Sequence, residues 1–491
     1  MMEKLLEKCN AILKEIKANK FFANSILYIA ASFLIKGISF LTTPIFTRLM
    51  GTADYGIVSN FTMWANFFAV FICLQMTAGI VAAKVTRSVE ELDVYVARIT
   101  RMCIAFALVI GCFIFLFRNF ISNITEIDSI YLLPMLIVAY GHSAINLYSS
   151  YCIAQERPKA KVKFSTINSL FITLCGVMMV LFFADKSQGR IIGFVVAYGL
   201  VALYVSVRFA FIKTKGVGSG KKDVMYALTF GIPLIPHLLA NMVNGNADRV
   251  FIIKLFGENE AGIYSVAYSI GAIALTFADA CTDAWTPWYF SETKCKNKEQ
   301  VNRYLKFYSF TIAMCFFGVM MLAPEIMKIM ADETYYTGMP CIKYVALGIC
   351  FLFLYRFPLC YEQYNGNTKF VAPATVICAA INIILNSIFV PKYGIEGAAF
   401  TTLLSYIILW ILHEIVVRFI IKNYNIDFKS YLPAIVISCI GFVLSDMLSE
   451  KFFLRYFIIA IFCISYLFYA GNILKYKKKN SVKRNDDYDK R

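Results

Sequence analysis

Ionisable side chains inside long apolar segments are the residues of this sequence most able to do chemistry. Lys36 lies near the middle of the first apolar segment, and Arg249 and Arg356 lie at the polar ends of later ones. A charge inside a bilayer is costly unless it faces water or a protein-lined interior. Arg grips phosphate and carboxylate groups with its planar fork, and Lys does so as a point charge. We expect these three cations to bind an anionic substrate, although Lys36 has the alternative of a structural pair with an acid.

Acidic residues in the same kind of segment are candidates for coupling to an ion. Asp279 and Asp283 are four residues apart and so share one helical face, and Glu362 follows Arg356. We predict that they hold a proton or Na⁺; pairing with a cation, or a solvated cytoplasmic helix end for the two aspartates, stays open. The amides Asn382 and Asn386 are also four apart, and we expect structural hydrogen bonds from them.

No pattern in the sequence is typical of a catalytic site. The stretch 216–222 approaches a phosphate-binding loop but lacks its first Gly and its final Ser or Thr. The 15 Cys are scattered singly and no Cys-x-x-Cys occurs, so we interpret them as packing residues. The three His are far apart and show no metal-binding spacing: His142, His237 and His413. We therefore expect no enzyme activity, no metal and no bound cofactor.

The elements that position these residues are predicted to be transmembrane helices. The chain has 491 residues, of which 59% are hydrophobic and 16% charged, whereas soluble domains are about 25% charged. Many apolar runs reach the roughly 20 residues that cross a bilayer. The sequence predicts an all-α polytopic membrane protein with about 14 spans, at 24–47, 57–80, 99–118, 130–152, 165–184, 191–212, 226–248, 261–285, 305–327, 340–362, 371–390, 395–421, 431–448 and 453–474.

The net charge of +17 fits a membrane topology better than nucleic-acid binding. Cytoplasmic loops of membrane proteins collect Lys and Arg, and most of the 48 basic residues fall on cytoplasmic segments if the amino terminus lies inside. We therefore expect a multi-pass protein of the plasma (inner) membrane with both termini in the cytoplasm. Residues 1–23 predict an amphipathic surface helix, not a cleavable signal, and 475–491 a basic disordered tail.

One motif occurs twice, in residues 48–59 and again in residues 254–265. Both copies read [RK]-L-x-G-x-x-[DE]-x-G-I-x-S and lie 206 residues apart. Six predicted spans separate them, an even number, so the two halves run in the same direction as parallel repeats. We expect each copy to be an outer hinge whose glycines allow a tight turn. These glycines are Gly51, Gly56, Gly257 and Gly262.

The repeat defines the predicted domain organisation. We expect two parallel-repeat six-helix lobes with two additional carboxy-terminal helices. The stretch 231–236, with two prolines, predicts a break in its span, which is either a structural kink or a bend that moves. The predicted segments are an amphipathic part at 1–23, lobes at 24–212 and 226–421, a basic linker at 213–225, two helices at 422–474 and the tail at 475–491.

Two stretches resemble a known family. Residues 24–56 are similar to the opening of Wzx-type polysaccharide flippases, and 392–399, Lys-Tyr-Gly-Ile-Glu-Gly-Ala-Ala, resemble a turn of the same family. The superfamily also contains the MATE drug exporters and the lipid II flippase. The resemblance implies two lobes around a central cavity, alternating access, and export of undecaprenyl-pyrophosphate-linked oligosaccharides. It also implies membrane lipid and other polysaccharide assembly proteins as partners, no nucleic acid, and coupling to H⁺ or Na⁺.

Two other functions are alternatives to flipping. A cation-coupled multidrug exporter of the same fold would need a well-defined buried carboxylate site, for which Asp279 and Asp283 are candidates. A membrane glycosyltransferase or polymerase would need a large outer loop. We expect only short loops, the longest near 286–304 and 213–225, at about 20 residues or fewer. Transport is therefore the predicted function, and drug export is the alternative.

Overall fold

The computed structural model describes residues 37–38, 40–84, 86–213, 219–295, 297–366 and 368–468. Within these ranges every regular element is a helix and no strand occurs, which confirms the predicted all-α class. The predicted surface helix at 1–23, Lys36 with most of the first span, and the tail at 475–491 lie outside the described residues.

The helices have the length and apolar character of membrane spans. Among the described residues, nine are long and apolar enough to cross a bilayer, or ten if the bent pair Glu258–Gly271 and Leu275–Lys294 is one span. Two shorter apolar helices, Leu432–Met447 and Phe452–Phe468, lie where spans were predicted at 431–448 and 453–474. The protein is thus a multi-pass membrane protein, and the total of about 14 spans stays a prediction.

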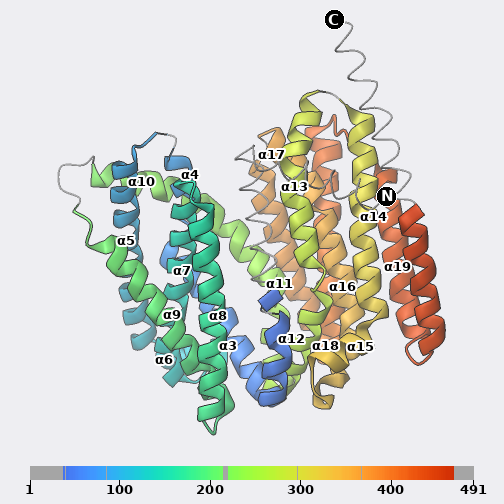
Figure 1. Ribbon diagram of the computed structural model, residues 1–491, viewed down its shortest axis with the longest axis horizontal. Helices are drawn as coiled ribbons and strands as arrows, with labels where there is room; N and C mark the ends of the chain where they lie inside the picture. Colours follow the sequence, from blue (N-terminus) through green and yellow to red (C-terminus); the bar gives the residue numbers. More distant parts are fainter. Residues whose placement is uncertain are drawn as a thin grey trace, which may run out of the picture. The chain divides into compact units, whose positions relative to one another are not determined.

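The chain forms two compact units, and the first comprises residues 1–242 and 252–262. Its longest helices pack side by side, with α7 against α3, α5 and α9, and α8 against α9. Large side chains such as Tyr95, Phe209 and Phe61 fill its interior. Its elements are a helix at 40–49, α3 (Thr52–Cys73), α4 (Ala78–Ala83), α5 (Val89–Leu116), α6 (Arg118–Thr125), η1 (Ser129–Tyr131), α7 (Leu132–Ala154), α8 (Pro158–Phe182), α9 (Lys186–Ala210), α10 (Gly220–Gly231), η2 (Ile232–Leu234) and parts of α11 (Ile235–Phe256) and α12 (Glu258–Gly271) (Figure 1).

The second unit comprises residues 243–251 and 263–491. Within it α16 packs against α13, α14 and α18, and α14 packs against α19. Besides its parts of α11 and α12, its described elements are α13 (Leu275–Lys294), α14 (Lys298–Met321), α15 (Ala323–Met330), η3 (Glu333–Gly338), α16 (Met339–Leu354), α17 (Arg356–Tyr364), η4 (Thr368–Phe370), α18 (Val371–Ile415), the π-helix η5 (Val416–Ile421), η6 (Phe428–Ser430), α19 (Leu432–Met447) and Phe452–Phe468.

Local sequence accounts for several helix starts. Ser88 precedes α5, and its Oγ accepts the Glu91 backbone N–H at 3.3 Å while the Glu91 carboxylate accepts the Ser88 N–H at 2.8 Å. This reciprocal pair is a capping box, which satisfies donors that the first helical turn leaves free. At α9 the carboxylate of Asp185 accepts the Gln188 N–H at 2.9 Å. Polar residues between two apolar runs therefore mark where these helices begin.

Two broken helices meet at their breaks in the first unit. The predicted break at 231–236 occurs, because α10 ends at Gly231 and a 3-10 turn leads into α11. An unpredicted break separates α3 from α4, where Leu74 and Gln75 adopt left-handed backbone angles with φ of 43° and 53°. A Cβ added at Gly231 would overlap the backbone oxygen of Leu74. Glycine therefore allows the close contact of the two breaks.

The long element α18 consists of two helices joined at a reversal. A straight helix of 45 residues would measure about 68 Å at roughly 1.5 Å per residue, more than twice the apolar thickness of a bilayer. Gly394, with φ of 57° and ψ of −138°, interrupts it, and these backbone angles favour glycine. The two segments correspond to the separate spans predicted at 371–390 and 395–421.

One predicted loop is wrong. Residues 286–294 continue α13 to Lys294, and α14 begins at Lys298. Trp285 and Tyr289 of this helix are buried, and their rings stack at a centroid distance of 5.4 Å. Burial of these aromatic side chains stabilises a helix that its polar residues concealed in the sequence.

Candidate functional site

Asp248 on α11 is a buried carboxylate among hydroxyl groups. Its side chain accepts hydrogen bonds from the hydroxyl of Tyr264 and, at 3.1 Å, from that of Thr402. The residue is 1% exposed, and the backbone N–H of Arg249 also donates to it at 2.8 Å. Such a cluster keeps a carboxylate satisfied inside the second unit. In the sequence, Asp248 directly precedes Arg249, which was predicted to lie at the polar end of its span.

Arg249, a predicted substrate cation, is held beside this carboxylate. Its Nη1 donates to the Asn246 side-chain oxygen at 2.5 Å, and its Nε donates to the Ser265 hydroxyl at 3.2 Å. The guanidinium also lies 4.9 Å from the ring centroid of Tyr268. These contacts fix the orientation of a half-buried cation and leave Asp248 next to it.

Arg356 and Asp279, predicted for different roles, form an ion pair. Arg356 Nη2 lies 2.7 Å from Asp279 Oδ1, and Nη1 donates to the Thr282 hydroxyl at 3.1 Å. The side chains are 21% and 33% exposed, respectively. Asp283, one turn further along α13, is exposed. The structure thus joins Asp279 to a cation, which was one of the open alternatives, and places Asp283 outside this pair.

Glu362 has a partner that the sequence did not indicate. Its Oε1 lies 2.7 Å from Nδ1 of His413, and both side chains are completely buried. The other atoms of the pair, Glu362 Oε2 and His413 Nε2, are buried and have no hydrogen-bond partner among the described residues. Two titratable groups enclosed in a membrane-spanning unit are a functional candidate by default.

The predicted amide pair forms the expected structural hydrogen bonds. Asn382 donates to the Ser405 hydroxyl at 2.8 Å, and Asn386 donates to the Asn382 side-chain oxygen at 3.0 Å. The Thr401 hydroxyl in turn donates to Asn386 at 2.7 Å. This chain of hydrogen bonds ties together the two segments of α18.

The repeated motifs contact each other in the first unit. A Cβ added at Gly56 would overlap the backbone oxygen of Glu258, and one added at Gly262 would overlap the backbone oxygen of Thr52. Gly56 and Gly262 occupy the same position in the two motif copies, 206 residues apart, and so do Thr52 and Glu258. The contact is therefore reciprocal, because the glycine of each copy meets the same backbone position of the other copy. Thr52 also donates a hydrogen bond to the side-chain oxygen of Asn259.

At Gly56 and Gly262 the reason for glycine differs from the predicted tight turn, whereas Gly257 has the backbone conformation that such a turn needs. Gly56 and Gly262 lie inside α3 and α12, where the missing side chain permits the close approach. Gly257 alone has a left-handed backbone, with φ of 85°, whereas Gly51 caps α3 at an ordinary φ of −67°. The hinge role of these glycines stays a prediction.

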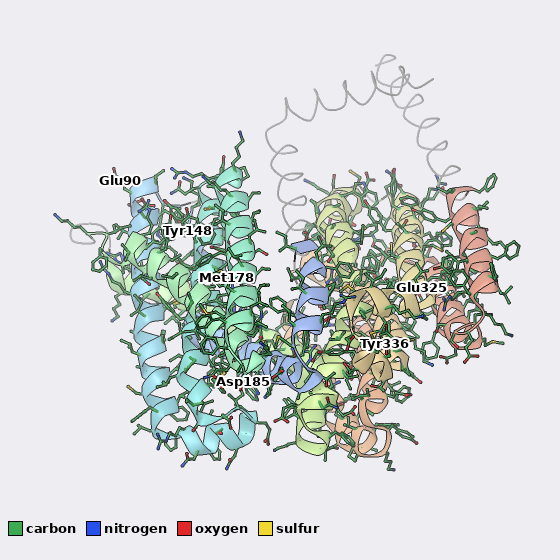
Figure 2. The ribbon with its side chains drawn as sticks, turned by 60° about the horizontal axis from the view of Figure 1, so that its bottom comes forward. Glu90, Tyr148, Met178, Asp185, Glu325 and Tyr336 are labelled. Carbon is green, nitrogen blue, oxygen red and sulfur yellow. The ribbon has the colours of Figure 1, made fainter. Side chains whose placement is uncertain are left out.

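A small acidic hollow of about 140 Å³ lies in the first unit. Asp185, at the start of α9 (Figure 2), lines it together with Glu126, Asp128 and Glu258. Among the described residues, no group of three or more His, Cys, Asp or Glu side chains has the arrangement of a metal site. The hollow is therefore a local concentration of negative charge.

Among the functional candidates, Arg356 and Asp279 form an ion pair, Glu362 pairs with His413, and Arg249 lies beside the buried Asp248. Such pairs can bind a charged group or an ion by exchanging one partner for another. The sequence identified Arg249, Arg356, Asp279 and Glu362 from their positions in apolar segments, but not their partners. Lys36 lies outside the described residues.

Comparisons with known proteins place the chain in a family. The family model described as "Polysaccharide biosynthesis protein" matches residues 21–294, more than half of the 491 residues. The chain is 22% identical over 384 residues to "Lsg locus putative protein 1" of Haemophilus influenzae, with 74% of this chain and 90% of the relative covered. It is 29% identical over 171 residues to "Probable low-salt glycan biosynthesis flippase Agl15" of Haloferax volcanii, covering 33% of this chain and 36% of that protein.

A solved structure has the same fold. "Lipid II flippase MurJ, inward closed conformation" superposes with a TM-score of 0.69 at 18% identity, covering 92% of this chain and 99% of that chain. At this identity the likeness concerns the fold, which is that of a membrane transporter. From the family match and this fold, the chain belongs to the polysaccharide biosynthesis protein family of multi-pass membrane proteins.

Proposed function

We propose that this protein is a flippase for lipid-linked saccharides. It would carry undecaprenyl-pyrophosphate-linked oligosaccharide repeat units from the cytoplasmic to the outer leaflet of the plasma membrane, for polysaccharide assembly. Membership of the polysaccharide biosynthesis family carries the proposal. The names of two similar proteins, a glycan biosynthesis flippase and a lipid II flippase, support it because both describe flippases.

The chemistry of the substrate explains the need for charged helices. A saccharide with a pyrophosphate must cross an apolar layer about 30 Å thick, and desolvating its charges there costs far more than thermal energy. The guanidinium groups of Arg249 and Arg356, with Lys36, would replace water around the anionic group. The lipid tail stays in the bilayer, so the protein need only shelter the polar end while access alternates from one side to the other.

Coupling to an ion gradient would act through the acidic partners. The Glu362–His413 pair changes its net charge by one when it takes up a proton, and both groups are buried. Asp279 would bind the coupling cation in place of Arg356 only when the substrate binds Arg356. Anion binding and ion release would then be linked, as reciprocal coupling requires. Drug export on the same fold would use the acids alone.

Leaflet-resolved detection of the saccharide tests the proposal. Cells depleted of the protein, and lacking any redundant flippase, are converted to spheroplasts and exposed to a membrane-impermeant lectin specific for the repeat unit. We expect the outer-leaflet signal to fall at least several-fold, while the total after permeabilisation stays constant or rises. Restoring the wild-type chain should restore the signal.

Two results would contradict the proposal. Normal outer-leaflet delivery in depleted cells would exclude a required flippase. An unchanged lectin signal together with increased drug sensitivity on depletion would favour the multidrug exporter. A matched control is the variant Arg208→Gln, which removes an exposed cation at the end of α9 and should leave delivery unchanged.

A further inference from the structure

Arg190 is a partly buried cation that packs against the apolar interior of the first unit. It lies four residues after the start of α9 at Lys186, about 6 Å along the helix axis at roughly 1.5 Å per residue. Its guanidinium carbon lies 3.7 Å from the ring centroid of Phe46 and 4.1 Å from that of Phe194. Both rings belong to the same buried cluster of apolar side chains.

The guanidinium has no anionic partner in the described part of the chain. Nη1 is buried and donates no hydrogen bond, and no acceptor reaches Nε or Nη2 among the described residues. Contact with a ring stabilises a cation by roughly 0.5–2 kcal/mol, whereas removing an ion from water costs several kcal/mol even in relaxed proteins. The two aromatic rings therefore do not offset the desolvation of the buried part of this cation, which includes Nη1.

Most other shielded arginines in the described part of the chain are paired with carboxylates. Arg249, which also has no ion pair there, instead donates to the side chains of Asn246 and Ser265, so Arg190 is unusual in having neither kind of partner. The ion-paired arginines with side chains under 30% exposed are Arg87 and Arg98 with Asp223, Arg356 with Asp279, Arg418 with Glu414, and Arg455 with Glu325.

Close packing of α8 and α9 fixes the position of Arg190. A Cβ added at Gly176 would overlap Nη1, so the guanidinium lies directly against the backbone of α8. Gly193 of α9 approaches the same residue of α8, because a Cβ added at Gly193 would lie 2.8 Å from the Cα of Gly176. Two rings and a glycine thus hold the planar group in one orientation. Nη1 is enclosed, whereas the unbonded Nε and Nη2 keep accessible surface.

We propose that Arg190 binds an oxyanion, a phosphate or carboxylate, of the transported lipid-linked saccharide. This inference rests on the proposed flippase function. The free edge formed by Nε and Nη2 matches the two oxygens of such a group, and a bidentate contact of this kind is among the strongest hydrogen bonds in proteins. Preorganisation of the edge removes the entropy cost of ordering the side chain on binding.

Binding of a short pyrophosphate lipid tests the site directly. The purified full-length protein in a nonionic detergent is titrated with farnesyl pyrophosphate, and the dissociation constant is measured by microscale thermophoresis. We expect Arg190→Gln to weaken binding by about 10- to 100-fold, the range of a lost charge-assisted hydrogen bond. Arg190→Lys keeps the charge without the planar fork, so its affinity for the probe should lie between those of the wild type and Arg190→Gln.

Matched variants separate the site from general effects. Arg208→Gln removes one positive charge from the same helix and should bind the probe as the wild type does. Gly176→Ala keeps the charge but displaces Nη1, so it should also weaken binding. Size-exclusion profiles and thermal unfolding of each variant show whether the protein is folded; if Arg190→Gln is not, Arg190→Lys and Gly176→Ala decide the result.

Several outcomes would overturn the inference. Equal affinity of the wild type and Arg190→Gln would do so, as would an equal loss in Arg208→Gln. Farnesol binding as tightly as farnesyl pyrophosphate would show that the anion does not contribute. Displacement of the probe by phosphatidylglycerol from the wild type, but not from Arg190→Gln, would assign the site to a membrane lipid headgroup instead.

The inference can fail independently of the proposed function. If Arg190→Gln binds the probe normally while depletion still abolishes outer-leaflet delivery, the flippase function stands and the role of Arg190 is lost. If depletion leaves delivery unchanged, the flippase function itself fails, whatever the affinity for farnesyl pyrophosphate.

Discussion

Replacing His413 by Leu is expected to destabilise the protein more than replacing its partner Glu362 by Leu. The two side chains are completely buried, and Glu362 Oε1 meets His413 Nδ1 at 2.7 Å, while Glu362 Oε2 has no hydrogen-bond partner among the described residues. Without His413 the carboxylate would have no donor in this part of the chain. Removal of one member of a buried pair costs about 3–5 kcal/mol because it leaves an uncompensated charge.

The reverse substitution leaves the imidazole of His413 without its carboxylate. The cost is that of a buried polar group with no partner, about 1–3 kcal/mol. The double Leu variant removes both polar groups and replaces them with side chains of similar size. Its stability should therefore lie within about 1 kcal/mol of the wild type, since well-packed apolar substitutes for buried pairs are often neutral.

Unfolding in mixed detergent micelles measures these differences. The free energy of unfolding of the wild type, both single variants and the double variant gives the interaction energy of a double-mutant cycle. We expect the double variant to be more stable than the His413→Leu variant by at least about 2 kcal/mol. Additive losses, or a larger loss for the Glu362 variant, would refute the description of the pair as a buried charge and its only partner.

Two further predictions concern the repeat contact and the ion pair on α13. Gly56→Ala and Gly262→Ala each force a backbone oxygen to move, so thermal unfolding should show a loss of stability of about 1–3 kcal/mol. The control Gly318→Ala, with no atom within 4 Å of its added Cβ, should change stability by less than about 1 kcal/mol. Equal effects of the three substitutions would contradict the close contact. Arg356→Gln should abolish most outer-leaflet delivery of saccharide. It should lower stability by only about 0–1 kcal/mol, because the ion pair of Arg356 with Asp279 is partly exposed. Unchanged delivery would remove Arg356 from the proposed substrate path.

The sequence predicts the helices well because span length is a local property. Apolar runs of bilayer length are visible without knowledge of their neighbours, and the two prolines at 231–236 break a helix by covalent geometry alone. The break after α3 could not be predicted, because Leu74 and Gln75 are neither glycine nor proline. Their left-handed conformation accompanies contact with Gly231, which lies more than 150 residues away in the chain.

The candidate site is less predictable because its charges act in pairs. Apolar surroundings identify a functional charge in the sequence, but not the residue that meets it. Arg356 and Asp279 were predicted for different roles and are partners. His413 showed no metal spacing and proved to be the partner of Glu362. Arg190 carries no sequence signal beyond its charge, since only the three-dimensional structure reveals the lack of an acid beside it.

The reciprocal contact between Thr52–Gly56 and Glu258–Gly262 has a consequence for the origin of the chain. In oligomers such a contact is called isologous, because one patch meets a second copy of itself. A shorter protein with a single copy of the motif would already carry both halves of this joint and could form a homodimer through it. In the fused chain, a substitution at one glycine has to be accommodated by the other, so we expect Gly56 and Gly262 to change together among relatives.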